Sequence, residues 1–507
     1  MKSNILIFKN WQGDLLAIIA GSLIPFAFAP FDFSILALVS ICLLMLSWAN
    51  ISRRRAFFRG WLFGLFMFGI GVNWIHISMM EFGGVNAFLS YFLTSLFVMF
   101  LALFPAVTGY MARRFSDRGT HQIAREYLLI IPAMWTMFEW IKGFIFTGFP
   151  WLSLGYSQLY LPVSGFAPLV GVYGVSFVLV LSSGFIVYWL LMGKQVTKIA
   201  LPSLLILWIV PYSLNQLNWS DPVEKPITVS LIQGNISQDK KWLREELRPT
   251  LQMYTKLSRE NWNSDLIIWP ETAIPSFHHQ VETFLQDIAQ EARMNGSELL
   301  VGLPVYNNKE KLYFNSMMSL GLKEGFYHKE HLVPFGEFIP FKDWIGDILQ
   351  FFNIPMSNFS SGTQESPVLL VGGHKAGISI CYEDVFGEEV IAALPEAKFL
   401  INASNDAWFG DSVAAPQHLQ IAQMRSLETS RHLVRSTNTG VSAFIDEKGR
   451  IISKSPEFER HVLTSQVIPM EGMTPYAVFG NITIISTISI LLGIAFFLGK
   501  EKSESTN

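Results

Sequence analysis

The uneven distribution of charge along the chain constrains its fold more than any other feature of the sequence. Charged side chains are sparse as far as Asn215, occur at an ordinary density from Gln216 to Glu471, and are then absent until Lys500. Only 15% of the 507 residues are charged, whereas about a quarter are charged in a typical soluble protein. The sequence therefore predicts a membrane part, a separate water-exposed domain and a final hydrophobic segment.

Eight hydrophobic stretches are candidates for membrane spans, each of which requires about 20 mostly apolar residues. They lie near residues 12–30, 34–50, 57–78, 86–111, 127–147, 163–192, 199–215 and 476–499. The stretch at 163–192 contains Pro168 and several glycines, so we expect it to tilt or kink. The first stretch also resembles a cleavable signal peptide. Because the second stretch follows so closely, retention of both as a helical hairpin is favoured.

Basic residues predict the orientation of these spans, because Lys and Arg gather in cytoplasmic loops. Basic clusters follow the second, fourth, sixth and eighth stretches: Arg53–Arg55 with Arg59, Arg113 with Arg114 and Arg118, Lys194 with Lys198, and Lys500 with Lys502. Eight spans with both termini in the cytoplasm satisfy every cluster. We therefore expect spans one to seven at 1–215, an extracytoplasmic domain at 216–471, and a final span with a cytoplasmic tail at 472–507. A cytoplasmic domain would invert all the clusters.

Two charged residues interrupt the fifth stretch. Glu139 and Lys142 are three positions apart and share one face of a helix. A charge at this depth costs about 3 kcal/mol on insertion scales and usually faces the interior of the bundle. A mutually satisfied structural pair is the favoured interpretation, and a substrate contact stays open.

The 216–471 domain alternates short β-rich runs with helical stretches. The expected strands are 227–233, 266–269, 299–305, 313–320, 368–371, 376–381, 399–403 and 442–445, and the expected helices are 281–292 and 417–434. This alternation predicts an α/β layered domain with helices packed on its sheets.

Three segments of this domain carry reactive side chains. Glu271 follows the buried strand Leu266–Trp269, Lys329 opens the run His328–Glu337, and Cys381 ends the strand 376–381 at a tight turn. Taken singly, such residues are more often a solvated carboxylate, a surface cation and a small core residue. A lone unpaired cysteine in an oxidising compartment is, however, exposed to damage, so its presence favours a chemical role.

The residue types also exclude some functions. His328 and His331 lack the cysteines or the HExxH pattern of a zinc site, so no metal and no other cofactor is expected. The net charge of −3 gives no indication of a nucleic-acid-binding surface.

The motifs taken together resemble a known family. Trp269-Pro270-Glu271, the run from Lys329 to Glu337, and Cys381-Tyr382-Glu383 are similar to the Glu-Lys-Cys triad motifs of the nitrilase superfamily, which has an α-β-β-α sandwich fold. Further segments narrow the resemblance to the apolipoprotein N-acyltransferases: 149–158 (beginning Phe-Pro-Trp), 233–235 (Gln-Gly-Asn), 331–337 and 405–410 (Asn-Asp-Ala-Trp-Phe-Gly). The resemblance extends over the whole chain.

The resemblance implies a two-step acyl transfer, the last step of bacterial lipoprotein maturation. A phospholipid, typically phosphatidylethanolamine, would donate its sn-1 acyl chain to Cys381. The α-amine of the S-diacylglyceryl cysteine of an apolipoprotein would then accept it. The enzyme would be a multi-pass protein of the bacterial inner membrane with a periplasmic catalytic domain.

Individual roles follow partly from chemistry and partly from this resemblance. A thiol is only a few per cent ionised near neutral pH, so Cys381 needs a base, for which Glu271 is the candidate. Lys329 could stabilise the oxyanion, a contribution of about 3–4 kcal/mol. The resemblance adds Glu337, Glu383 and Tyr382 as supporting residues and Trp242 and Trp151 as substrate-binding residues.

Three questions stay open from the sequence. A membrane-tethered carbon–nitrogen hydrolase would use the same triad with water as acceptor. A transporter with an inactive sensor domain would require internal symmetry and broken helices, which are not evident. The apolar run Phe351, Phe352, Ile354, Met356 and Phe359 is either hidden core or a lid facing the membrane.

The orientation can be tested with reporter fusions. Alkaline phosphatase fused after Ser237 should be active, and the same reporter fused after Arg118 should be inactive, because the basic clusters place these points on opposite sides of the membrane. Enzyme activity of matched fusions in whole cells is the measurement. The reverse pattern would overturn the predicted topology.

Overall fold

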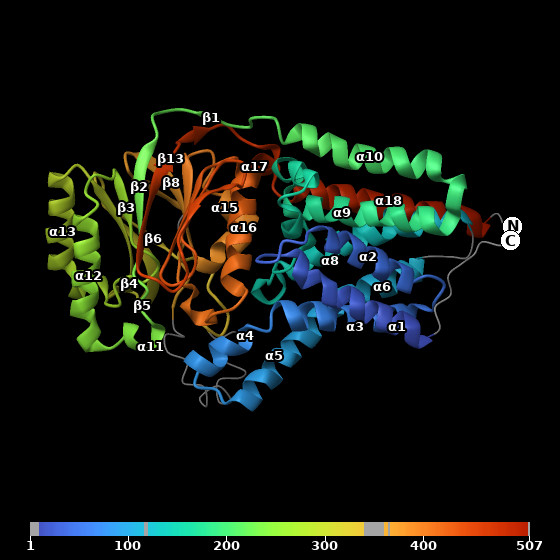
Figure 1. The fold of residues 1–507 in the computed structure, drawn as a ribbon, viewed down its shortest axis with the longest axis horizontal. Coiled ribbons are helices and arrows are strands. Elements are labelled where there is room, and N and C mark those ends of the chain that lie inside the picture. The colour runs from blue at the N-terminus through green and yellow to red at the C-terminus, as the bar shows by residue number, and fades with distance from the viewer. Residues whose placement is uncertain (1–9, 116–119, 339–358, 364–365, 505–507) are drawn as a thin grey trace. The chain divides into compact units, whose positions relative to one another are not determined.

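The computed structural model describes residues 10–115, 120–338, 359–363 and 366–504, and it divides the chain into two compact units (Figure 1). The first unit comprises Met1–Asn73, Tyr91–Leu217 and Val478–Asn507. The second comprises Trp74–Ser90 and Asn218–Ala477. Most of the apolar run at 351–359 lies outside the described residues; of its five apolar side chains only Phe359 is described.

The first unit is helical. Its helices are α1 (Asn10–Leu23), α2 (Ile35–Ser47), α3 (Arg53–Gly71), α6 (Leu103–Phe115), α7 (Thr120–Arg125), α8 (Ile131–Lys142), α9 (Ala167–Met192), α10 (Thr197–Leu214) and α18 (Ile482–Glu504), with α5 (Ala87–Leu101) starting in the second unit. Helix α9 is kinked at Gly171, where φ is 66°. A φ of this sign favours glycine, so the bend expected in the 163–192 stretch has a defined position.

Several described helices have the length and apolar character of membrane spans. Three qualify outright: Ala87–Phe115, Pro162–Gln195 and Thr197–Leu214. A fourth candidate, Arg53–Gly71 with Ile75–Phe82, is bent by 58°, so the expected span at 57–78 is not one straight helix. Ile35–Ser47 and Ile482–Leu498 are shorter apolar helices on two more of the expected spans. The count of eight spans and their orientation stay predictions.

The second unit is built around two six-stranded sheets. The first has the order β13-β2-β3-β4-β5-β6 and the second β12-β11-β10-β9-β8-β7. The strands of the first sheet are β2 (Ile227–Gln233), β3 (Leu266–Ile268), β4 (Glu298–Asn307), β5 (Leu312–Leu320), β6 (Gly325–His328) and β13 (His461–Val467). Those of the second are β7 (Val368–Val371), β8 (His374–Ile380), β9 (Phe399–Ser404), β10 (Leu433–Thr437), β11 (Ala443–Ile445) and β12 (Ile451–Lys454). A short pair joins β1 (Asp221–Pro222) to β14 (Met470–Glu471).

Helices cover the outer faces of both sheets. Figure 1 shows α12 (Leu247–Arg259) and α13 (Glu282–Met294) beside the first sheet, and α15 (Gly387–Ile391) and α16 (Ala414–Thr429) beside the second. The shorter helices are α4 (Ile75–Ile77), α11 (Gln238–Lys241) and α17 (Pro475–Phe479). The order helix, sheet, sheet, helix confirms the α/β layered domain that the sequence predicts and is the α-β-β-α sandwich that the resemblance to the nitrilase superfamily implies.

Strand β3 contributes side chains to two hydrophobic layers, one on each face of its sheet. On β3, Leu266 and Ile268 join the core between the sheets, whereas Ile267 and the adjoining Trp269 pack into the layer under α12 and α13. Successive strand residues point to opposite faces, so a continuous apolar run is what a strand buried on both sides requires. Packing on both faces of β3 therefore holds the chain in place just before it reaches Glu271.

The prediction of a helix at 417–434 is wrong at the C-terminal end, where the observed helix stops earlier. Helix α16 ends at Thr429, and Leu433–Thr437 forms β10, which pairs in parallel with β9. Ser430 adopts the left-handed conformation, with φ 50° and ψ 50°, and this terminates the helix. The sequence analysis also missed β6, β12, β13 and α12.

Gly302 on β4 is a sensitive point in this packing. A Cβ atom there would lie 2.2 Å from the Pro270 oxygen and 2.9 Å from the Glu271 Cα, both backbone atoms. Gly302→Ala should therefore lower the stability by about 1–3 kcal/mol or more, because rigid backbone must move. Thermal unfolding of the purified variant in detergent measures this.

Gly325→Ala is the matched control, because the nearest atoms to its Cβ would be the ends of the Leu369 and Ser319 side chains, at 3.2 and 3.4 Å. It should unfold close to the wild-type temperature. Equal stability of the two variants would contradict the close packing of β4 on the backbone of Pro270 and Glu271.

Candidate active site

The three predicted reactive residues each follow the end of a strand in the α/β unit. Glu271 lies three residues after β3, Lys329 directly after β6, and Cys381 directly after β8. All three are buried, with 6%, 0% and 9% of their surface exposed, respectively. Strand ends of α/β sheets are where ligand-binding groups gather, and the fold brings these three segments from far apart in the sequence.

Lys329 is held between two carboxylates. Its Nζ lies 3.5 Å from Glu271 Oε1 and 2.9 Å from Glu337 Oε2. Burial alone would lower the pKa of Lys329, but Glu337 and Glu271 together raise it above its usual value. The two carboxylates therefore favour the charged ammonium form of Lys329.

Asn315 connects the same two carboxylates, and the sequence analysis did not identify it. Its Nδ2 donates to Glu271 Oε1 at 2.7 Å and to Glu337 Oε1 at 3.0 Å, while its main-chain carbonyl accepts from the main-chain N–H of Lys329 at 2.8 Å. One side chain on β5 thus sets the separation of Glu271 and Glu337. A buried asparagine inside an apolar strand is the only sequence signal that could have revealed it.

Lys241 is a second buried cation that the sequence analysis missed. It lies at the C-terminal end of α11, is 2% exposed, and donates from Nζ to the Glu271 carbonyl at 3.3 Å. Burial lowers the pKa of Lys241 to about 8, although Glu271 acts in the opposite direction. The loop carrying Glu271 is therefore fixed through its main chain as well as through its carboxylate.

Cys381 occupies a strained turn. Its φ is +52°, a region that few non-glycine residues adopt and that typically costs about 1–3 kcal/mol. Burial and the Glu271 carboxylate raise the pKa of the Cys381 thiol, while Lys329 lowers it. The resting thiol is therefore protonated and depends on a neighbouring base to become a nucleophile.

Glu383 links the cysteine turn to the lysine segment. Its Oε1 accepts the N–H groups of Glu330 at 2.6 Å and His331 at 3.2 Å, and its Oε2 accepts the Ile380 N–H at 2.6 Å and the Tyr327 hydroxyl at 3.0 Å. Burial raises the pKa of Glu383, against which Lys329 and these backbone donors act. The contacts are those of a residue that positions two segments.

The other predicted site residues have different surroundings. Tyr382 is buried, with its ring 5.2 Å from that of Phe386. Trp242 is 38% exposed just after α11. Trp151 belongs to the helical unit, where it is buried and its ring stacks on Phe149 at 5.9 Å. The proposed contacts of these residues with substrate stay predictions.

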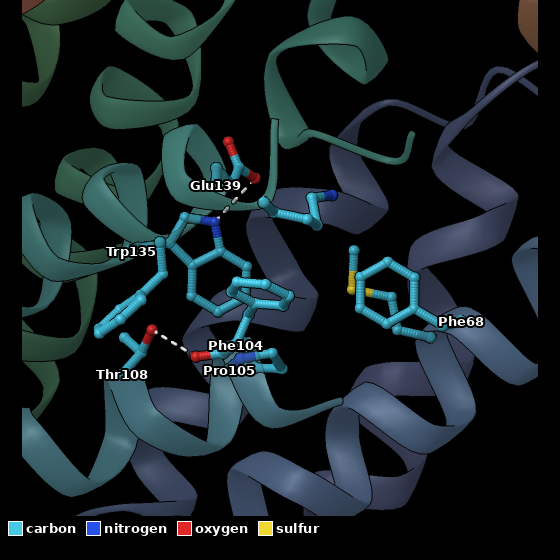
Figure 2. A pocket seen from close by; sticks show the side chains of 9 residues that line it. Phe68, Phe104, Pro105, Thr108, Trp135 and Glu139 are labelled. Atoms are coloured by element: carbon cyan, nitrogen blue, oxygen red, sulfur yellow. Dashed lines mark hydrogen bonds between the residues drawn. The ribbon is translucent and has the colours of Figure 1, made fainter. Parts of the chain in front are cut away.

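The charged residues of the fifth expected span line a cavity of about 20 Å³ in the helical unit (Figure 2). Glu139 Oε1 accepts from Trp135 Nε1 and from the Leu154 N–H, both at 2.9 Å, and Lys142 donates to the Trp151 carbonyl at 2.6 Å. The two charges interact electrostatically, as the expected pair requires, and each also has hydrogen-bond partners of its own. Both side chains serve a structural purpose, because they fix the loop that follows α8.

The histidines of the lysine segment have local partners. His328 Nδ1 lies 2.7 Å from Ser316 Oγ, and His331 Nδ1 lies 2.7 Å from Glu389 Oε1. Within the described ranges, no group of three or more His, Cys, Asp or Glu side chains is arranged to hold a metal ion.

Asn315→Asp tests the electrostatics of the site. A third carboxylate beside Glu271 and Glu337 should raise the pKa of the Cys381 thiol further, because a nearby negative charge disfavours the thiolate. Less thiolate is then present near neutral pH, so alkylation of Cys381 by iodoacetamide should slow and its pH profile should move to higher pH. On the acidic side of the profile the rate should fall about tenfold for each unit by which the thiol pKa rises.

Peptide mass spectrometry of modified Cys381 across a pH series measures this shift. Asn307→Asp, which adds the same charge at the far end of β4, should leave the profile in place. An unchanged profile in Asn315→Asp would show that the carboxylates do not control the thiol.

Two protein-family models match the chain. The N-terminal domain model of apolipoprotein N-acyltransferases matches residues 20–185, and the carbon-nitrogen hydrolase model matches residues 228–476. These two matches cover both units described above.

Similar proteins extend over nearly the whole chain. An apolipoprotein N-acyltransferase of Methylococcus capsulatus is 43% identical, covering 97% of each chain. Those of Vibrio cholerae and Coxiella burnetii are each 39% identical, covering 97% and 96% of this chain and 99% and 100% of the relative. The resemblance deduced from the motifs is confirmed: the chain belongs to the apolipoprotein N-acyltransferase family.

Proposed function

We propose that this protein transfers the sn-1 acyl chain of a phospholipid to the α-amine of the S-diacylglyceryl cysteine of an apolipoprotein, through a thioester on Cys381. The observation that carries the proposal is the buried Lys329, held between Glu271 and Glu337 in the same buried network as Cys381. Membership of the acyltransferase family supports the choice of substrates. Phosphatidylethanolamine is the proposed donor.

In the first half-reaction Glu271 removes the proton of the Cys381 thiol, and the thiolate attacks the ester carbonyl of the phospholipid. The carbonyl oxygen becomes an oxyanion, which the Lys329 ammonium stabilises. When the tetrahedral intermediate collapses, the C–O bond to the glycerol breaks. The proton held by Glu271 passes to the leaving oxygen, so that lysophospholipid departs and the thioester remains.

In the second half-reaction the neutral α-amine of the diacylated apolipoprotein attacks the thioester carbonyl. Lys329 again stabilises the oxyanion, and Glu271 takes a proton from the attacking nitrogen. The C–S bond then breaks and the amide forms. Cys381 recovers its proton from Glu271, which returns the enzyme to its starting state.

The same set of groups suits both half-reactions for an electrostatic reason. A permanently charged Lys329 is already in place when negative charge develops, so no reorganisation is needed at that moment. Glu337 and Asn315 are the partners that keep it there. Glu383, which joins the cysteine turn to the lysine segment, is a positioning residue in this mechanism.

The proposal includes a membrane location, because both substrates have acyl chains embedded in the bilayer. We infer seven spans within 1–215, a periplasmic catalytic domain at 216–471, and a last span at 472–507, with both termini in the cytoplasm of a bacterial inner membrane. The long apolar helices of the first unit support this arrangement. Trp151 and Trp242 are proposed substrate contacts, and Tyr382 a neighbour of the nucleophile.

The covalent intermediate is the decisive prediction. With phosphatidylethanolamine and no acceptor, the enzyme should release about one lysophospholipid per active site and then stop, the burst expected of ping-pong chemistry. Intact-protein mass spectrometry should show one added acyl group, located on Cys381 and removable by hydroxylamine. A diacylated lipopeptide with a free α-amine should then clear the acyl-enzyme and give triacylated product.

Three variants check the assignment of roles. Cys381→Ala should show neither burst nor mass gain, and Glu271→Gln should show both strongly reduced. Lys329→Met should slow acylation by about 10²–10³-fold, as loss of an oxyanion donor generally does. Continuous release of fatty acid without acceptor would favour a hydrolase, and acyl transfer in Cys381→Ala would exclude the covalent mechanism.

A further inference from the structure

A second cluster of buried charges lies next to the cysteine turn but has no part in the mechanism above. It consists of Asp384, Asp406, His418 and Arg435, none of which is more than 3% exposed. The four residues come from four different elements: the turn that begins at Cys381, the turn after β9, helix α16 and strand β10. Charges buried this completely require partners, and here they supply one another.

Arg435 spans the two turns with the two ends of its guanidinium. Nη1 donates to Asp384 Oδ2 at 3.2 Å, and Nη2 donates to Asp406 Oδ2 at 3.0 Å. His418 spans the same two carboxylates: Nε2 lies 2.7 Å from Asp384 Oδ1 and Nδ1 lies 3.2 Å from Asp406 Oδ1. A guanidinium and an imidazole thus bridge the same pair of turns.

The charged groups of this cluster shift one another's pKa values. Burial and Arg435 would lower the pKa of His418, but Asp384 and Asp406 raise it above its usual value. For Asp406, burial acts to raise its pKa, but Arg435 and His418 lower it. Arg435 Nη2 also lies 2.8 Å from His418 Nδ1, so the imidazole contacts the guanidinium as well as the two carboxylates.

The cluster is connected to the cysteine by short contacts. Asp384 lies three residues after Cys381 in the same turn. Asn402 accepts a hydrogen bond from Arg435 and donates to the Cys381 carbonyl at 3.1 Å. Ser404 donates to Asp406 Oδ1 at 3.0 Å and also hydrogen-bonds the Cys381 thiol. Arg435 is thus connected to the Cys381 main chain through Asn402 and to the Cys381 thiol through Asp406 and Ser404.

Stability alone does not account for such a network. Apolar side chains of similar volume generally stabilise a core as well as buried ion pairs do, or better. Charged hydrogen bonds differ in being directional, and the turn that they hold contains a residue at φ +52°. A strained turn persists only where its surroundings over-determine it.

We propose that Arg435, assisted by His418, is a positioning residue that ties the cysteine turn to the turn carrying Asp406 and so holds the Cys381 thiol in its reactive place. The proposal rests on the function proposed above, since the reaction it serves is acylation of Cys381. A planar fork is needed because its two nitrogens must reach both turns at once, which the single ammonium of a lysine cannot do.

Arg435→Lys is the test, because it keeps the charge and removes the fork. With phosphatidylethanolamine as donor, the acylation rate constant should fall by about 10²-fold, as small misplacements of a reacting group do, while KM stays near the wild-type value. Alkylation of Cys381 by iodoacetamide should slow as well. Since alkylation needs no lipid, it tests the positioning role even if the proposed acyl transfer is wrong.

Arg431→Lys is the matched control. Arg431 is equally buried, but its guanidinium donates to the carbonyls of Ala397, Ser430 and Gly472, none of which belongs to the cysteine turn. This variant should lose thermal stability while keeping both rates. Wild-type rates in folded Arg435→Lys, or an equal loss of rate in Arg431→Lys, would overturn the proposal.

A second variant decides the matter should Arg435→Lys fail to fold. His418→Gln retains a donor for Asp384 but not the contact with Asp406, so the same two rates should fall to a smaller extent with KM unchanged. Wild-type rates in this variant would also count against the bridging role.

Discussion

The burial of one cation organises the candidate site. Lys329 has no exposed surface, and an ammonium group removed from water must find charged or polar partners. Glu271 and Glu337 meet this need, and Asn315 bridges the two carboxylates from β5. The positions of the proposed base and of the proposed oxyanion donor are therefore set by the same interaction. Any change in one member alters the charge state or place of the others.

Cys381 is held by two separate networks on either side of its turn. Glu383 ties the turn to the segment after Lys329, and Asp384 ties it to Arg435 and His418. These neighbouring residues point to different partners, because the short helical turn that begins at Cys381 sends successive side chains in different directions. Both networks hold the turn in which the cysteine adopts its strained φ. The same turn carries the thiol whose pKa is raised by burial and by the Glu271 carboxylate.

The local pattern of apolar and polar residues predicted most of the strands, but it did not predict where they end or with which strands they pair. Strand β2 has the expected bounds, since its continuous apolar run is typical of a strand buried on both faces. The region 417–434 looked like one helix because apolar spacing carries on past Thr429, and the left-handed Ser430 that ends the helix has no clear sequence signal. Strand β13 alternates exposed and half-buried residues at the edge of its sheet, so its pattern was weak.

The sequence by itself determined the division into a hydrophobic part and an α/β domain, the family, and the selection of Glu271, Lys329 and Cys381 as candidate site residues. These follow from composition and from motifs that are continuous in the chain. Only the tertiary structure decided that Asn315 and Lys241 hold the proposed base, that Glu139 and Lys142 have separate hydrogen-bond partners, and that Arg435 bridges two turns. Each of these contacts joins groups from different elements, which only the folded chain brings together. Hydrogen bonds between such groups have no periodicity along the chain, because they depend on how the elements pack and not on the local order of residues.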